Sequence, residues 1–157
     1  MEPGYQSNDY LIVSKLDMTF NNLSGLVGIK SNPNIKRGDV LVFHPPIAPQ
    51  TFFVKRAIGL PGEKVIVKNG KVTIINEEHP NGLVLKEDYI DKNEPTLGDV
   101  SVTVEQGKYF VLGDNRRPSG SYDSRDWGLL PKENIIGVAY MRLLPVSAIG
   151  TLSRPNY

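Results

Sequence analysis

Short apolar runs separated by turn-forming residues make up most of this chain. Runs of about four to eight residues rich in Val, Ile, Thr and Phe, bounded by Gly, Pro, Asn or Asp, are typical of β-strands. With 15 Gly and 12 Pro among 157 residues, the pattern predicts an all-β fold with at most short helical turns, one of them at residues 131–134. The strands are expected at residues 9–15, 40–43, 51–58, 64–75, 100–104, 108–112 and 135–144.

Residues 64–75 carry the most specific local signal. Two apolar runs flank Asn69-Gly70, and Asn-Gly between strands is the strongest short-range sign of a hairpin. Residues 76–97 then turn polar and rich in Pro and Gly, so we expect an irregular excursion out of the main sheet. Together, residues 64 to about 107 are predicted as an insertion within one domain that spans the chain.

Composition excludes several classes of protein. The 18 basic and 17 acidic residues give a net charge of +1, which lacks the basic footprint of a nucleic-acid-binding domain. The chain has no cysteine, and its two histidines, His44 and His79, lie far apart in sequence, so we expect no metal and no other cofactor. No stretch reaches the roughly 18 apolar residues of a membrane span, and Glu2-Pro3-Gly4 does not begin a signal peptide.

Lys55 is the first candidate for chemistry. Strand alternation places it on the same face as Phe53 and Ala57, while Arg56 faces the other side, so one of these two cations has an apolar setting. Burial lowers the pKa of an amine from its usual value near 10.4, which would make Lys55 a usable general base. The ordinary alternative is a lysine whose stem packs on the strand while its amine reaches solvent.

Residues 113–128 are the second candidate, because they combine turn formers, charges of both signs and hydroxyls between two apolar runs. Serine is the obvious nucleophilic partner for a neutral lysine in a chain without cysteine, and Ser-Lys pairs are a known variant of the nucleophile-plus-base arrangement. Spacing does not choose among the serines of this loop. The ordinary alternative is a solvated loop held by ion pairs. The three serines are Ser119, Ser121 and Ser124.

Two multi-residue motifs in this chain resemble bacterial type I signal peptidase (leader peptidase). Residues 53–63 (FVKRAIGLPGE) form the first, and residues 113–116 (GDNR) with 121–125 (SYDSR) form the second. They occur in the order found in the family. The lysine at position 55, where a histidine would mark another branch, implies the bacterial form. Weaker matches extend the resemblance over nearly the whole chain, at residues 9–15, 37–43 and 127–137.

The resemblance implies a mainly antiparallel signal-peptidase-like β fold and a role for each matched residue. Lys55 becomes the general base of a Ser-Lys dyad, and Ser121 becomes the hydroxyl that orients the lysine amine. The supporting residues implied are Asp114, Arg116, Asp123 and Arg125, and the substrate-binding residues implied are Phe52, Phe53, Val54, Met1, Pro3 and Tyr5.

The family's nucleophile lies in a motif of serine, methionine, any residue and proline. Here the chain begins Met1-Glu2-Pro3, so the resemblance places the serine immediately before Met1, after an upstream strand and a membrane anchor. The 157 residues alone are therefore expected to be inactive. Two departures accompany this match: Gly4-Tyr5 replaces the usual pair after proline, and the loop after Arg116 is longer than usual. The spacing from residues 123–125 favours Ser121 over Ser119.

The function implied is that of the extracytoplasmic domain of a signal peptidase I. The whole enzyme would be anchored in the cytoplasmic membrane and would cleave signal peptides from exported preproteins through an acyl-enzyme. One alternative is an inactive homologue that acts as a binding or chaperone factor for exported or pilus proteins. A weaker alternative, a self-cleaving Ser-Lys repressor, is disfavoured by residues 113–125 and by the lack of a DNA-binding segment.

Overall fold

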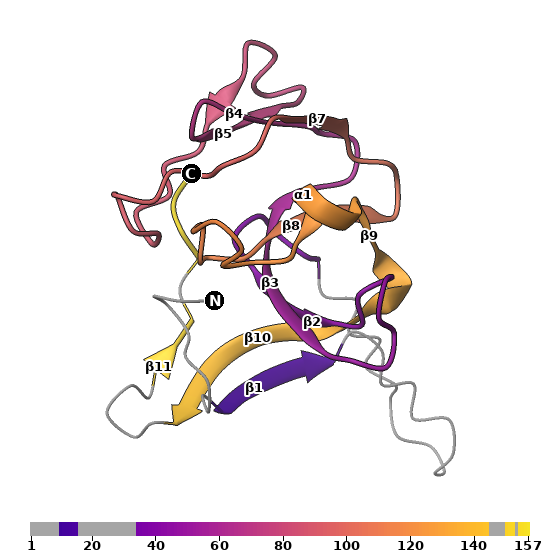
Figure 1. Cartoon of the computed structure of the whole chain (residues 1–157). Helices are drawn as coiled ribbons and strands as arrows, with labels where there is room; N and C mark the ends of the chain where they lie inside the picture. Colours follow the sequence, from indigo (N-terminus) through magenta and orange to yellow (C-terminus); the bar gives the residue numbers. More distant parts are fainter. Residues whose placement is uncertain (1–9, 16–33, 145–149, 153) are drawn as a thin grey trace.

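The computed structural model describes residues 10–15, 34–144, 150–152 and 154–157, which form two antiparallel β-sheets (Figure 1). The larger sheet has seven strands in the order β1-β10-β2-β3-β8-β9, with β11 paired to β10. Its strands are β1 (Tyr10–Lys15), β2 (Val40–Phe43), β3 (Phe53–Gly59), β8 (Lys108–Leu112), β9 (Leu130–Pro131), β10 (Ile135–Leu144) and β11 (Gly150–Thr151).

The smaller sheet has four strands in the order β6-β5-β4-β7 and lies at the top of Figure 1. Its turn at Asn69 and Gly70 has positive φ at both positions, 51° and 77°, as a two-residue hairpin of type I′ requires. The predicted hairpin is therefore confirmed. The strands are β4 (Lys64–Lys68), β5 (Lys71–Ile75), β6 (Leu83–Val84) and β7 (Val100–Thr103).

The all-β prediction is confirmed, and the differences from it are local. The predicted irregular excursion at residues 76–97 contains β6, which pairs with β5, and neither β9 nor β11 was predicted. All strands of the smaller sheet lie within residues 64–107, and their status as an insertion stays a prediction. The single turn expected near residue 131 is the 3₁₀ helix η1 (Lys132–Asn134).

A short helix, α1 (Ser124–Trp127), lies within the loop that follows β8. Asp123 caps it by accepting a hydrogen bond from Arg125 N, and the carboxylate of Asp126 accepts one from the backbone N–H of Asp123. This reciprocal pair is a capping box. Neither helix in the described part of the chain has the length or the apolar character needed to cross a membrane.

Strand β3 separates two hydrophobic cores, because alternate residues along it point to opposite faces. Ala57 lies in a core with Leu41 and Phe43 of β2, while Ile58 lies in a second core with Val65 of the smaller sheet. The second core therefore joins the two sheets. Its buried members are Ile58, Val65, Val67, Val72, Ile74, Leu85, Val104, Phe110 and Leu112.

Replacing Gly59, where β3 meets the second core, tests how closely the two sheets pack. A Cβ at this position would lie 2.4 Å from Val65 Cγ2 and 3.0 Å from Phe110 Cβ. We expect Gly59→Ala to lower the free energy of unfolding by about 1–3 kcal/mol, as other overpacking substitutions do. Chemical denaturation measures the change. Gly150→Ala is the matched control, since none of the described residues lies within 4 Å of its added Cβ, and an equal effect of both substitutions would contradict close packing.

Candidate active site

Lys55 is half-buried on β3, on the face that also carries Phe53. Its Nζ lies 5.4 Å from the centroid of the Phe53 ring, within the range of a cation–π contact. Burial lowers the pKa of Lys55 below that of an ordinary lysine, although the carboxylates of Asp123 and Asp114 act in the opposite direction. The neutral amine, which is the form that can accept a proton, is therefore more accessible than in a surface lysine.

Gly113, just beyond the end of β8, is the point at which Lys55 and Ser121 meet. A Cβ on Gly113 would lie 2.1 Å from Ser121 Oγ and 3.4 Å from Lys55 Nζ. Both side-chain ends therefore pack against the bare Cα of Gly113, and the structure places Ser121 beside Lys55. The other two serines of the loop differ: Ser119 is exposed, and Ser124 Oγ accepts a hydrogen bond from Val111 N at 2.9 Å.

Ser121 Oγ is buried and makes no hydrogen bond of standard geometry with the described residues. It lies near enough to Asp123 to help lower the pKa of that carboxyl group. Most buried polar atoms are hydrogen-bonded in proteins, and an exception calls for an explanation. A hydroxyl that can still form hydrogen bonds and lies beside a buried amine is suited to orient that amine or to bind a substrate.

Asp123 holds the loop at Gly113 by accepting a hydrogen bond from the backbone N–H of Gly113. Its fully buried carboxylate accepts hydrogen bonds from Gly113 N at 3.0 Å and from Arg125 Nε and Nη2 at 2.8 and 2.9 Å. Burial alone would raise the pKa of Asp123, but the Arg125 guanidinium outweighs it and the pKa is lowered. Asp123 therefore stays ionised and holds both the strand end and α1.

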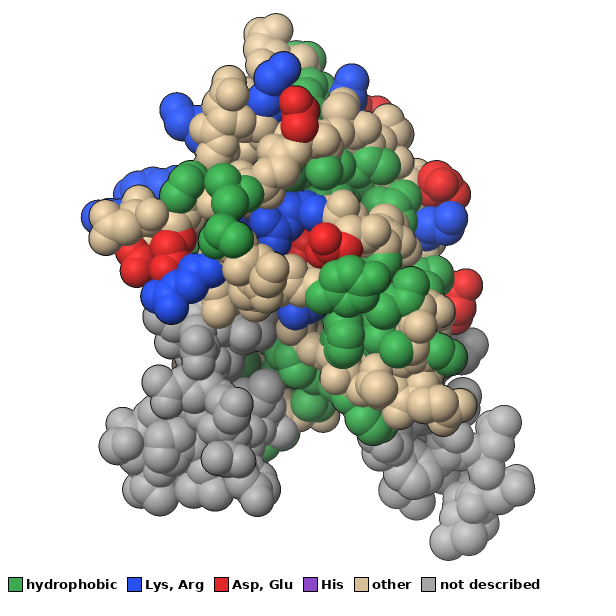
Figure 2. Space-filling model, viewed as in Figure 1, with side chains coloured by type: hydrophobic (Ala, Val, Ile, Leu, Met, Phe, Trp, Pro, Cys, Tyr) green, Lys and Arg blue, Asp and Glu red, His purple; other side chains and the backbone are tan. Residues whose placement is uncertain are grey.

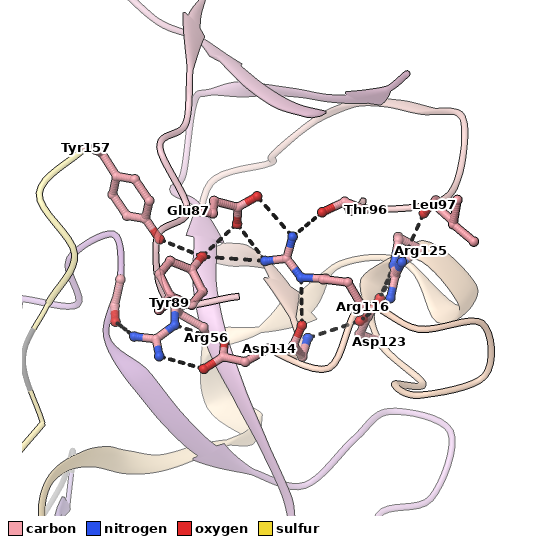
Figure 3. Close-up of polar contacts among 12 residues, drawn as sticks. Arg56, Glu87, Tyr89, Thr96, Leu97, Asp114, Arg116, Asp123, Arg125 and Tyr157 are labelled. Atoms are coloured by element: carbon pink, nitrogen blue, oxygen red, sulfur yellow. Dashed lines mark hydrogen bonds and ion pairs between the residues drawn. The ribbon is translucent and has the colours of Figure 1, made fainter. Parts of the chain in front are cut away.

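Arg116 holds the same glycine by donating a hydrogen bond to its backbone carbonyl (Figure 3). Its side chain is fully buried, and its Nε donates to Gly113 O at 2.8 Å. The other guanidinium nitrogens donate to both carboxylate oxygens of Glu87, at 3.0 and 2.6 Å, and to the Thr96 hydroxyl. Burial of the guanidinium is outweighed by Glu87, so the pKa of Arg116 is raised. The loop of the larger sheet is thereby tied to the segment between β6 and β7.

Two tyrosines extend this network toward the last described residues. Tyr89 donates its hydroxyl hydrogen to Glu87 Oε1 at 2.6 Å, and its oxygen lies 2.9 Å from the Tyr157 hydroxyl. Burial, together with the charge of Glu87, raises the pKa of Tyr157 to about 12 even though the Tyr89 hydroxyl opposes the rise. Both phenols are therefore neutral hydrogen-bonding groups across the physiological pH range.

Arg56 and Asp114 form a second buried pair (Figure 3). Arg56 Nε and Nη2 donate to the two oxygens of Asp114 at 3.0 and 2.6 Å, and Nη1 donates to Gly38 O at 2.8 Å. The guanidinium also lies 4.3 Å from the centroid of the Tyr89 ring. Of the two neighbouring cations on β3, Arg56 is the more deeply buried, and it is held by a bidentate pair.

The first half of β3 has an open edge on the side facing β8. Ala57 exchanges backbone hydrogen bonds with Gly38 and Asp39, both at 2.8 Å, so its backbone groups face β2. Because these groups alternate along an antiparallel strand, those of Val54 face the other side. There β8 has already ended at Leu112, opposite Arg56. Among the described residues, no strand pairs with residues 53–55 on this side.

Comparison with known proteins identifies the family of this chain. The family described as signal peptidase, peptidase S26, matches residues 1–144, which include both sequence motifs. The chain belongs to this family. A signal peptidase I of Leptolyngbya laminosa is 40% identical over 99% of this chain and 70% of its own length. A probable signal peptidase I-2 of Synechocystis sp. is 37% identical over 98% of this chain and 63% of its own length.

A solved relative supports the fold of this family member. The crystal structure of a signal peptidase I from Enterococcus faecalis V583 superposes with a TM-score of 0.55 at 35% identity, covering 67% of this chain and 96% of that chain. The present chain spans 63–70% of the length of the two relatives named above. The activity of the whole protein is therefore a matter for proposal.

The remaining predicted site residues lie around the open edge or outside the described part of this signal-peptidase family member. Phe52 is 67% exposed beside His44, with ring centroids 4.6 Å apart. Phe53 packs edge-on to Phe43 at 6.2 Å, and Val54 is half-buried. No group of three or more His, Asp or Glu residues within the described ranges could hold a metal ion. Met1, Pro3 and Tyr5 lie outside the described residues.

Several residues that shape the site were not among the predicted ones. Glu87 and Thr96 hold Arg116, and Gly113 provides the surface on which the two side chains meet. The sequence signals Gly113 only as a turn former after a strand. Glu87 lies 29 residues from Arg116 in a polar stretch, where no local pattern distinguishes one carboxylate from another.

A glycine-to-alanine substitution tests the close approach at Gly113. Its φ is not among the positive values, so Gly113→Ala acts mainly through its contacts with Ser121, at 2.1 Å from Oγ and 2.6 Å from Cβ. We expect a loss of about 1–3 kcal/mol in the free energy of unfolding. Adding Ser121→Gly should restore most of this loss, and a double-mutant cycle by chemical denaturation measures the coupling. Strictly additive effects would show that the two residues do not touch.

Removing the charge of Asp123 tests the pH dependence of stability. The folded-state pKa of Asp123 is below the usual 3.8, so its ionised form stabilises the fold above that value, and the contribution disappears as the pH falls through the folded pKa. We expect Asp123→Asn to cost about 3–5 kcal/mol at neutral pH, as breaking a buried ion pair does, and progressively less in acid. Denaturation series at several pH values measure this. Asp88→Asn, at an exposed pair with Lys86, is the control, and a pH-independent deficit in Asp123→Asn would contradict the charge-based role.

Proposed function

We propose that this chain belongs to a signal peptidase I that cleaves signal peptides from exported preproteins by Ser-Lys acyl-enzyme chemistry. The observation that carries the proposal is the convergence of Lys55 Nζ and Ser121 Oγ on Gly113, with burial lowering the pKa of the lysine. A neutral amine held beside an unused hydroxyl is the arrangement that a lysine general base requires. Family membership supplies the class of substrate.

The open edge of β3 is the proposed binding site for the residues before the cut. An extended peptide laid beside Val54 adds a strand to the sheet, with backbone hydrogen bonds giving affinity and side-chain pockets giving specificity. Exposed Phe52 and half-buried Phe53 flank this edge. If the residues before the cut lie along residues 52–54 and the scissile carbonyl lies at Lys55, the substrate runs parallel to β3.

The proposed reaction begins with the nucleophilic serine that the family motif implies immediately before Met1. Its hydroxyl attacks the scissile carbonyl while Lys55 takes the proton, and the developing oxyanion is held by the serine's own N–H and a nearby donor. Lys55 then returns the proton to the leaving amine. A water molecule, deprotonated by Lys55, attacks the acyl-enzyme; the bond to the serine oxygen breaks, Lys55 returns the proton to that oxygen, and the signal peptide is released as a carboxylate. Ser121 keeps the Lys55 amine directed at the reacting oxygen throughout.

Replacing Lys55 in the full-length protein tests the assignment of the general base. We expect Lys55→Ala to slow cleavage of a preprotein by about 10²–10⁴-fold, the usual contribution of a positioned base, with a smaller loss for Ser121→Ala. Single-turnover cleavage followed by gel shift measures the rate. Lys64→Ala is the matched control, because Lys64 is an exposed lysine of the smaller sheet.

Two results would contradict this proposal in different ways. If Lys55→Ala cleaves as fast as its parent, the dyad assignment is wrong. If the full-length protein binds preproteins but cleaves none, and its coding sequence has no serine codon immediately before Met1, the protein is an inactive homologue that acts as a binding or chaperone factor.

A further inference from the structure

A cavity of about 530 Å³ lies beside the Lys55 site, within the range of roughly 300–1,000 Å³ typical of ligand sites. One wall is the segment at residues 97–100 leading into β7, and the other is the loop at residues 117–126. Neither the strand edge nor Lys55 lines it. The lining residues relevant here are Leu97, Arg117, Ser121, Tyr122, Arg125 and Asp126.

Ser121 connects this cavity to the Lys55 site. Its side chain packs against Gly113 next to Lys55 Nζ, and the same residue lines the cavity. The Lys55 site and the cavity therefore have Ser121 as a common boundary.

The position of β8 explains why a bound substrate must turn in this direction. A peptide beside residues 53–55 lies in line with β8, which ends opposite Arg56 and continues into Gly113. Beyond the level of Lys55, this line is occupied by β8 itself. The segment after the cut has to leave the plane of the sheet, and the loop at residues 113–126, which lines the cavity, directly follows β8 there.

The cavity is held in shape by the groups that also hold the catalytic loop. Arg125 Nη1 donates to Leu97 O at 2.9 Å, while its other nitrogens bind Asp123. Arg125 thereby ties one cavity wall to the carboxylate that anchors Gly113. On the rim, Arg117 forms an ion pair with Glu94. Both walls are therefore fixed before any ligand arrives.

The lining suits a polypeptide of mixed composition. Leu97 and Tyr122 are 48% and 51% exposed, so each offers apolar surface, while Arg125 and Asp126 bring charges of both signs. Figure 2 shows basic and acidic side chains gathered between groups of hydrophobic side chains on the face that carries α1. Because the cavity lining carries charges of both signs, it does not favour a polyanion. The backbone amides and varied side chains of a peptide can form polar and apolar contacts with it.

We propose that this cavity binds the first residues of the mature protein, immediately after the cleavage site, with Leu97 and Tyr122 as its apolar contacts. The inference rests on the proposed function and extends it to the other side of the scissile bond. The substrate then occupies two separate binding sites: the signal peptide lies along the β3 edge, and the mature segment lies in the cavity.

Peptide binding to the full-length protein tests the inference. Two fluorescent peptides share a signal-peptide end and a non-cleavable bond at the cut, and only one of them continues into the mature sequence. We expect the extended peptide to bind with a Kd about tenfold lower by fluorescence anisotropy. The double variant Leu97→Ala/Tyr122→Ala should abolish this advantage and leave the Kd of the short peptide unchanged.

The control variant is Val84→Ala, an exposed apolar residue of β6 that does not line the cavity, and it should keep the advantage. If both peptides bind the unmodified chain equally, or if the double variant keeps the advantage, the cavity is not the site and the proposed function stands. If neither peptide binds, the proposed function itself is wrong and the inference is wrong with it.

Discussion

The Gly113 peptide unit is the point on which the candidate site depends. Its N–H donates to Asp123, its C=O accepts from Arg116, and its Cα lies against both Lys55 and Ser121. Each clamping group is buried and is itself paired, with Arg125 or Glu87. A side chain at Gly113 would separate the two groups that the proposed chemistry needs together. The site therefore needs the missing side chain of Gly113 and the buried charged groups that hold its backbone.

Buried charge of this kind contributes to geometry more clearly than to stability. Removing charges from water costs several kcal/mol per ion, which their attraction offsets only with good geometry, whereas breaking one such pair costs about 3–5 kcal/mol. The pairs Arg56–Asp114, Arg116–Glu87 and Arg125–Asp123 surround one peptide unit. A displaced loop would leave at least one of these charges without its partner. We interpret the network as a device that allows a single position for the loop.

The strands of this fold could be predicted because each depends on local pattern. Val40–Phe43, Lys108–Leu112 and Ile135–Leu144 begin and end where the apolar runs do. The helix α1 was missed because its start is a capping box formed by Asp123 and Asp126, which resembles the polar turns around it. The strand β6 has only two residues and is defined by its pairing with β5. Short elements of this kind are fixed by tertiary contacts that no local window contains.

The candidate site also contains residues that local sequence motifs predicted and residues that they did not. Lys55 and Ser121 were predicted from motifs, and strand alternation correctly separated the face of Lys55 from that of Arg56. The partners of the arginines were not predicted, because Glu87 and Tyr157 come from distant segments. The separation of the two faces of β3 also separates the effects of substitutions on either side of the strand. Val65 and Phe110 pack in the second core, so a change in the volume of either side chain acts first on the contact between the two sheets, on the face of β3 opposite Lys55.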